Sequence, residues 1–264
     1  MNLPLGIMAV ASSYAGNNEV ITVHRNEKII AIIPAFNEQG KIGKVITRVK
    51  QEAAEWADTI LVIDDGSTDG TLKEAQALEA TVLSHPRNEG VGAAIRTGIE
   101  YALQHKFDIA FMLGADNQDN PFEVKRLITP ILNDNFDFVQ GSRYMAGGER
   151  VNIPLFRWIT TGFYSFLFKV IMRFPISDGT NGFRALRLNI FENKNINLWQ
   201  RWLNRYELEP YLFYKVIEYN FRVTEAPVTK SYPIDDSGYT KMVPIFDWWS
   251  ILRPLILLKM GLKK

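Results

Sequence analysis

The sequence predicts an α/β fold in which a mostly parallel sheet is flanked by helices. Short apolar runs end in polar turns, as strands that are buried on both faces do. Each run is followed, after a short link, by a segment whose apolar residues recur at helical spacing. This alternation is typical of a parallel sheet with helices on both faces. With 47% hydrophobic and 22% charged residues, the 264-residue chain has the composition of an ordinary folded protein.

The first half of the chain supplies the alternating elements in order. The run KIIAIIPAF (28–36) predicts a buried strand. In the helix predicted next, over 40–57, one face carries the apolar residues Ile42, Val45, Ile46 and Val49. A second run begins at 59 and ends at two aspartates, before a predicted helix at 71–80. The remaining predicted elements are a strand at 80–85, a helix at 90–105, and strands at 108–116 and 136–144.

The second half is dense in aromatic residues. Segment 153–175 has only three charged residues, Arg157, Lys169 and Arg173, and segment 246–264 joins two tryptophans to leucines and a basic end. Both predict amphipathic helices, which either belong to the core or lie on a membrane surface with cations toward lipid phosphates. Finding two such segments favours the membrane surface. No segment has the roughly twenty uninterrupted apolar residues that a membrane span requires.

We expect one domain over 28–245, preceded by an N-terminal extension (1–27) and followed by an apolar-basic tail (246–264). The extension lacks the positive start of a signal peptide, and Pro4 and Gly6 interrupt its apolar run.

Composition excludes several classes of function. A net charge of +1 argues against broad nucleic-acid binding, and the absence of cysteine excludes disulfides and thiolate metal sites. The three histidines form no metal or triad spacing and are expected at the surface: His24, His85 and His105. The motif GxSxG of serine hydrolases does not occur.

Three polar clusters follow predicted strands: Asn37-Glu38, Asp64-Asp65 and Asp116–Asp119. Ligands bind beyond the carboxyl ends of the strands in such sheets, so these clusters are expected to face one crevice. A carboxylate at the second cluster can accept hydrogen bonds from a nucleotide base or ribose, whereas Ser67 or Asp69 can cap the helix that follows. Both uses are compatible, and the functional one is favoured for Asp65.

The third cluster suggests a cation site. Asp116 and Gln118 are two residues apart in a segment that the sequence predicts to be extended. Their side chains are therefore expected to point the same way. One carboxylate and one amide oxygen, with phosphate oxygens completing the shell, suit Mg²⁺ or Mn²⁺. A solvated turn before Pro121 is the alternative. The nearby Gly90-Val91-Gly92 is better explained as a helix start than as a phosphate loop.

Six motifs occur in the order found in family-2 glycosyltransferases, and the chain most resembles the dolichyl- or polyprenyl-phosphate sugar transferases. They are IPAFNE (33–38), VIDDGSTDGT (62–71), NEGVGAAIRTG (88–98), GADNQDNP (114–121), GSRY (141–144) and SDGTNGFRAL (177–186). The resemblance, which spans roughly residues 28 to 245, implies a GT-A fold and a GDP- or UDP-sugar donor.

The resemblance also implies roles for individual residues. Nucleotide-sugar contacts would come from Pro34, Phe36, Glu38, Ile63, Asp64, Asp65, Ala115 and Asp116. The metal would be held by Asp116 and Gln118. Arg143 and Arg157 match arginines that hold the acceptor phosphate, Asp178 an acidic position at the reaction centre, and Lys241 a lysine on the donor pyrophosphate.

Two positions depart from the family pattern. Gly114 stands where the metal motif usually opens with aspartate, and Asp235 stands where an arginine usually precedes the late lysine. These departures leave three alternatives open. In the first, Asp116 and Gln118 alone hold the metal; in the second, Asp119 substitutes for the missing carboxylate; in the third, the site is catalytically weakened.

The resulting expectation is an inverting, metal-dependent transferase that moves a sugar to a polyprenyl phosphate at the cytoplasmic face of a membrane, with or without a membrane subunit. An anionic acceptor needs positioning rather than a general base. One alternative is a hydroxyl acceptor, for which Asp178 would be the base. The other is a non-catalytic subunit that binds nucleotide sugars.

Overall fold

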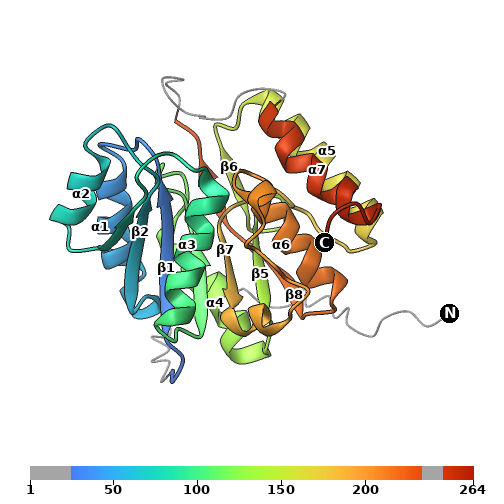
Figure 1. Ribbon diagram of the computed structural model, residues 1–264, viewed down its shortest axis with the longest axis horizontal. Coiled ribbons are helices and arrows are strands. Elements are labelled where there is room, and N and C mark those ends of the chain that lie inside the picture. Colours follow the sequence, from blue (N-terminus) through green and yellow to red (C-terminus); the bar gives the residue numbers. More distant parts are fainter. Residues whose placement is uncertain (1–24, 234–245) are drawn as a thin grey trace.

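The computed structural model describes residues 25–233 and 246–264, and its centre is a seven-stranded sheet (Figure 1). The strand order is β3-β2-β1-β4-β7-β5-β8. The strands are β1 (Ile29–Ala35), β2 (Thr59–Asp64), β3 (Thr81–Ser84), β4 (Ile109–Met112), β5 (Phe138–Ser142), β7 (Arg184–Arg187) and β8 (Val223–Pro227). A separate two-stranded sheet pairs β6 (Glu149–Val151) with β9 (Thr229–Ser231).

The predicted fold class is confirmed. Strands β1 to β4 pair in parallel, as do β5 and β8, and β7 alone runs antiparallel between β4 and β5 within this sheet. The sequence did not predict β7 or β8. The β7 segment, RALR, is only four residues long and begins and ends in arginine, so it lacks the apolar run that marks the other strands.

Helices cover both faces of the sheet (Figure 1). They are α1 (Ile42–Glu52), α2 (Thr71–Ala77), α3 (Val91–Gln104), α4 (Val124–Asp134), α5 (Leu155–Met172), α6 (Leu208–Glu218) and α7 (Phe246–Lys259). Short 3₁₀ turns occur at Ala54–Trp56, Pro121–Glu123, Leu188–Glu192 and Arg201–Leu203. The first of these turns ends the segment that the periodicity predicts as one helix over 40–57.

Alternate residues of β1 enter two different cores, because successive side chains of a strand point to opposite faces. Ile29 and Ile33 pack with α1 and α4, whereas Ile30 and Ile32 pack with α3, α6 and α7. Gly98 permits the close approach of α3: a Cβ atom there would lie 2.5 Å from Cγ2 of Ile32. The sheet is therefore buried on both sides.

The segment 246–264 contains α7, which lies beside α5 and contacts both α5 and α6 (Figure 1). Leu255 and Leu258 of α7 are buried in the same core as α6. Within the described residues, no helix is both long enough and apolar enough to cross a membrane.

Candidate active site

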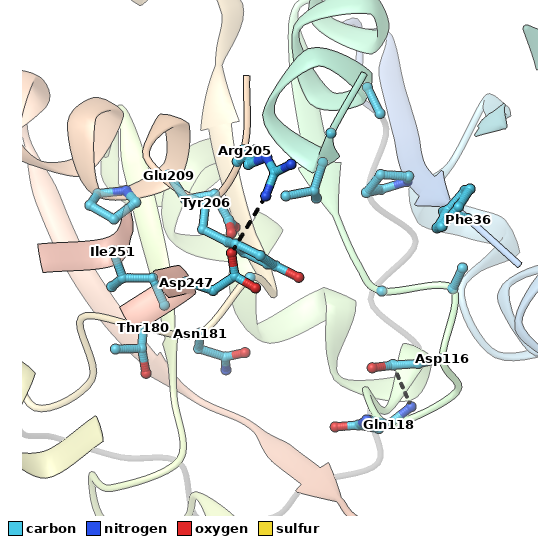
Figure 2. Close-up of a pocket in the computed structure, with 18 of the residues that line it drawn as sticks. Phe36, Asp116, Gln118, Thr180, Asn181, Arg205, Tyr206, Glu209, Asp247 and Ile251 are labelled. Atoms are coloured by element: carbon cyan, nitrogen blue, oxygen red, sulfur yellow. Dashed lines mark hydrogen bonds and ion pairs between the residues drawn. The ribbon is translucent and has the colours of Figure 1, made fainter. Parts of the chain in front are cut away.

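A cavity of about 490 Å³ opens where β1, β2, β4 and β5 end. Figure 2 shows two sides of it, with Phe36, Asp116 and Gln118 on one and Tyr206, Asp247 and Ile251 on the other. Of the predicted site residues, the lining includes Pro34, Phe36, Glu38, Asp65, Ala115, Asp116, Gln118, Arg143 and Arg157. Residues from all three polar clusters or their immediate neighbours thus meet at one cavity.

Three of the predicted residues do not line the cavity. Ile63 is fully buried in the core, and the carboxylate of Asp64 accepts hydrogen bonds from the Ser67 amide and the Ser84 hydroxyl. Asp178 has no exposed surface and lies behind Arg143. Lys241 lies outside the described residues, as does Asp235.

Asp65 organises the loop before α3. Its carboxylate accepts hydrogen bonds from the amides of Glu89 and Gly90 at 2.9 and 2.8 Å, and Nδ1 of His85 lies 2.7 Å from it. The expectation that His85 is a surface residue is wrong, because this contact and one to the Thr97 hydroxyl leave its side chain 12% exposed. Asp65 therefore fixes the cavity wall that contains Gly90.

Neither of the two capping candidates is the N-cap residue of α2, which is Gly70. Asp69 accepts a hydrogen bond from the amide of Thr71, the first residue of α2, at 2.9 Å. Ser67 instead accepts one from the amide of Asn37, which ties the β2–α2 loop to the loop after β1.

The segment carrying Asp116 and Gln118 is a turn rather than an extended strand, so that expectation is wrong. Asn117 has a φ of 59°, and the amide of Gln118 donates to Oδ1 of Asp116 at 3.2 Å. A short polar residue tolerates this left-handed conformation better than most. The two side chains still lie next to each other, as Figure 2 shows.

The donor atoms of this turn fit a hard cation. Oε1 of Gln118 is buried and has no hydrogen-bond partner among the described residues, which leaves an amide oxygen available beside the Asp116 carboxylate. Burial is the main cause of a raised pKa at Asp116, against which the nearby Lys230 acts. No cluster of three carboxylate or histidine ligands occurs within 25–233 and 246–264, so a cation would need oxygens from a ligand or water.

Asp119 is fully engaged by its neighbours. Its Oδ2 accepts a hydrogen bond from the Gly114 amide at 2.9 Å, and its Oδ1 pairs with Nζ of Lys230 at 2.8 Å. Burial alone would lower the pKa of Lys230, but the carboxylates of Asp119 and Asp116 raise it above its ordinary value. Lys230 is therefore a permanent cation in the cavity wall, and the sequence offered no local motif that could identify it.

Arg143 is held by a buried ion pair. It donates from Nε and Nη2 to the two oxygens of Asp178, from Nη2 to the Thr180 hydroxyl and from Nη1 to the Tyr232 hydroxyl. Within the described residues, one N–H group of Nη1 remains available to a ligand. Burial would raise the pKa of Asp178, but Arg143 lowers it below the ordinary value, so the pair stays ionised.

The other side of the cavity contains further ion pairs. Arg157, on α5, stacks over the ring of Tyr232 at 5.4 Å. Arg205 lies 4.0 Å from Asp247, a pair drawn in Figure 2, and Arg184 lies 3.1 Å from Glu209. The pKa of Tyr206 rises to about 12, chiefly through burial and secondarily through the charge of Asp247.

Comparison with known proteins identifies relatives of this chain. The profile described as "Glycosyl transferase family 2" matches residues 30–193. A UDP-N-acetylglucosamine–dolichyl-phosphate N-acetylglucosaminyltransferase of Methanococcus voltae is 27% identical, over 88% of this chain and 96% of that protein. A polyprenol monophosphomannose synthase of Mycolicibacterium smegmatis is 28% identical, over 79% of each chain.

Solved structures share the fold. A glucosyl-3-phosphoglycerate synthase of M. tuberculosis matches with a TM-score of 0.65 and 18% identity, over 90% of this chain and 82% of that one. The same enzyme has been solved in complex with Mn²⁺, UDP and glucosyl-3-phosphoglycerate. Since the family profile covers more than half of the sequence and the sheet has the GT-A arrangement of these structures, the chain belongs to glycosyl transferase family 2 and is a glycosyltransferase.

Proposed function

We propose that this enzyme transfers a sugar from a UDP- or GDP-sugar to a polyprenyl phosphate, with inversion, while it rests on the cytoplasmic face of a membrane. The observation that carries the proposal is that α5 has both a cation in the cavity and an exposed apolar face. This helix supplies Arg157 to the cavity and at the same time exposes a long apolar face. An anionic head and an apolar tail are the two parts of a lipid phosphate.

The exposed face of α5 is unusually apolar for a protein surface. Its large exposed side chains are Leu155, Phe156, Trp158, Ile159, Phe163, Phe166 and Val170, with exposed fractions of 48–68%. Contiguous apolar surface of this kind marks an interaction site. Two exposed cations, Lys169 and Arg173, lie at the end of the helix, where they would meet anionic headgroups.

The apolar face reaches the cavity mouth. Phe156 of α5 contacts Trp248 of α7 edge to face, with ring centroids 6.3 Å apart, and Trp248 lines the cavity. Trp249, its neighbour, is 53% exposed. A prenyl chain could therefore lie along apolar side chains while its phosphate enters the cavity beside Arg157.

The donor would occupy the opposite side of the cavity. Pro34 lies near the end of β1 and Phe36 and Glu38 follow that strand, and all three would contact the nucleoside. Asp116 and Gln118 would hold Mg²⁺ or Mn²⁺, which when bound withdraws charge from the departing diphosphate. Lys241, predicted on that diphosphate, remains a prediction from the sequence.

The proposed reaction is a single displacement. An oxygen of the acceptor phosphate forms a bond to the anomeric carbon as the bond from that carbon to the donor diphosphate breaks, which inverts the centre. The acceptor is already an anion, so no residue needs to remove a proton. Arg157 and the available N–H group of Arg143 would position the acceptor, and Asp178 would act by holding Arg143 in place.

The hydroxyl-acceptor alternative requires a base, and the geometry speaks against the residue proposed for it. Both oxygens of Asp178 are bonded to Arg143, and its side chain has no exposed surface. The second alternative, a non-catalytic binding subunit, predicts nucleotide binding without transfer, which the assay below distinguishes from catalysis.

The test incubates purified protein with UDP- and GDP-sugars, Mg²⁺ or Mn²⁺, and a short polyprenyl phosphate, with the unphosphorylated polyprenol as the matched acceptor control. Mass spectrometry of the organic extract should find a glycosylated lipid phosphate with the phosphate acceptor alone. The Asp116→Ala variant should form at least about a hundredfold less product, the effect of losing one group that stabilises developing charge. Transfer to a soluble phosphorylated acceptor instead would overturn the lipid assignment.

A further inference from the structure

Lys230 is built into the loop that carries the predicted metal ligands. It lies on β9 and lines the cavity together with Asp116 and Gln118, and its side chain is 13% exposed. The amide of Ser231 donates to the Gln118 carbonyl at 2.9 Å, and Asp119 and Lys230 form an isolated β-bridge. The ammonium group is therefore fixed relative to this loop by backbone contacts as well as by its ion pair.

Gly114 makes room for this arrangement. A Cβ atom at position 114 would lie 2.9 Å from Oδ1 of Asp116 and 3.5 Å from Oδ2 of Asp119. A side chain there would crowd both carboxylates. With glycine, Asp119 instead accepts a hydrogen bond from the amide of residue 114 and pairs with Lys230 through its other oxygen. Position 114 lacks a carboxylate, but the carboxylate of Asp119 lies against its amide and is paired with Lys230.

The charge of this cation matches the ligand expected beside it. A nucleoside diphosphate brings at least two negative charges toward the partly buried carboxylate of Asp116. The arginines that line the cavity come from other segments, namely Arg143, Arg157, Arg184 and Arg205. Lys230 is bonded to the Asp116–Asp119 loop itself, so it can offset the diphosphate charge at the place where that charge arrives.

We propose that Lys230 binds the donor diphosphate as a fixed cation, and that nucleotide binding by this chain consequently persists without a divalent metal. The proposal deepens the proposed function and rests on its nucleotide-sugar donor. A bound metal would add to the contribution of Lys230 rather than replace it.

The test measures binding of UDP and of GDP by isothermal titration calorimetry, once in excess EDTA and once in Mn²⁺. The wild type should bind at least one of them in EDTA. Lys230→Met should weaken that metal-free binding at least about tenfold, the effect of losing one charge-assisted hydrogen bond, while Lys230→Arg should retain most of it. Lys44→Met, at an exposed lysine of α1 outside the cavity, is the matched control and should bind as the wild type does.

A second variant keeps the test informative if Lys230→Met folds poorly. Asp119→Asn leaves Lys230 in place but removes the carboxylate that neutralises it, so metal-free nucleotide binding should become several-fold tighter. Unchanged or weaker binding by a folded Asp119→Asn would count against the proposal.

The outcomes separate this inference from the proposed function. Binding by the wild type in Mn²⁺ but not in EDTA would overturn the role of Lys230 and leave the proposed function standing. Equal metal-free binding by the wild type and Lys230→Met would do the same. If neither UDP nor GDP binds under either condition, the nucleotide-sugar donor itself is wrong, and the inference fails with it.

Discussion

Arg143 donates hydrogen bonds to both carboxylate oxygens of Asp178, from Nε at 2.6 Å and from Nη2 at 2.8 Å. The side chain of Arg143 is 3% exposed and that of Asp178 is 0% exposed. Such a bidentate pair fixes the plane of the guanidinium as well as its position. The amides of Ser177 and Asp178 are held in turn by the carboxylate of Glu225. Asp178 therefore positions the arginine that faces the cavity, and Glu225 in turn positions the backbone of Asp178.

Asp178→Asn should destabilise the fold. It leaves the Arg143 charge buried without its counterion, and removal of one partner of a buried pair costs about 3–5 kcal/mol. Urea unfolding measures this loss. Asp134→Asn, at an exposed aspartate of α4, is the matched control and should change stability by less than about 0.5 kcal/mol. A loss as small as that of the control would contradict the isolation of the pair from solvent.

The same pair predicts a pH dependence of stability. Burial works against ionised Asp178, but Arg143 lowers its pKa below the ordinary value. The pair therefore contributes above the unfolded pKa of about 3.9, and this contribution is lost as pH falls through the lower, folded pKa. The stability difference between the wild type and Asp178→Asn should be constant near neutral pH and shrink in acid. A difference that persists unchanged at the most acidic pH where both fold would argue against this assignment.

Gly114→Asp should reduce stability in the absence of metal. The new side chain would begin 2.9 Å from Oδ1 of Asp116 and would bring a third carboxylate to Asp116 and Asp119. Like charges at such a distance repel one another, and a divalent cation relieves the repulsion. Thermal unfolding should thus show a lower Tm in EDTA and a larger rise with Mn²⁺ than in the wild type. Gly114→Ala separates crowding from charge: it should lower Tm without enlarging the response to Mn²⁺.

Arg157→Ala should raise the KM for the lipid phosphate by at least about tenfold and leave the KM for the nucleotide sugar nearly unchanged, because it removes a cation from one side of the cavity. Arg157 is a better position for this test than Arg143, because removal of Arg143 would leave the buried carboxylate of Asp178 without its counterion. Lys169→Ala, at an exposed cation on the same helix but outside the cavity, should alter neither KM in detergent solution. Equal changes in both KM values for Arg157→Ala would indicate a general disturbance instead of acceptor binding.

The double variant Phe163→Ser with Phe166→Ser should weaken binding to anionic lipid vesicles at least about tenfold, since burial of each such side chain contributes about 1.5–3 kcal/mol. Both rings are largely exposed on α5, so the fold should tolerate the change. Leu103→Ser, at a 37% exposed leucine of α3, is the control. Vesicle sedimentation measures the binding, and equal sedimentation of both variants would show that this face of α5 does not contact lipid.

The sequence predicted what local patterns encode. The apolar run of β1 and the pair of aspartates at the end of β2 are each contiguous in the sequence, so the edge of the sheet that lines the cavity could be predicted without coordinates. The turn at Asn117 could not, because its φ of 59° depends on the hydrogen bond between Gln118 and Asp116. The burial of His85 likewise depends on a partner twenty residues away in sequence, Asp65.

Long-range pairs account for what sequence reasoning missed in the site. Asp119 and Lys230 are separated by 111 positions, and neither neighbourhood contains a motif that points to the other. The family resemblance identified both Arg143 and Asp178, but it gave each a separate contact with the substrate and did not predict their ion pair. Their pairing follows from β7, which brings the chain back between β4 and β5, and that strand carries too weak a pattern to predict.

The contribution of α7 to the cavity affects how this enzyme can diverge from its relatives. The stretch that matches the family profile ends at residue 193, yet Arg205, Glu209, Asp247 and Trp248 complete the cavity wall from beyond it. Substitutions in this later part can alter what the cavity accepts while the donor loops stay intact. Exchange of α7 between relatives is therefore a direct way to vary the cavity wall, and removal of this helix would open the wall at Asp247 and Trp248.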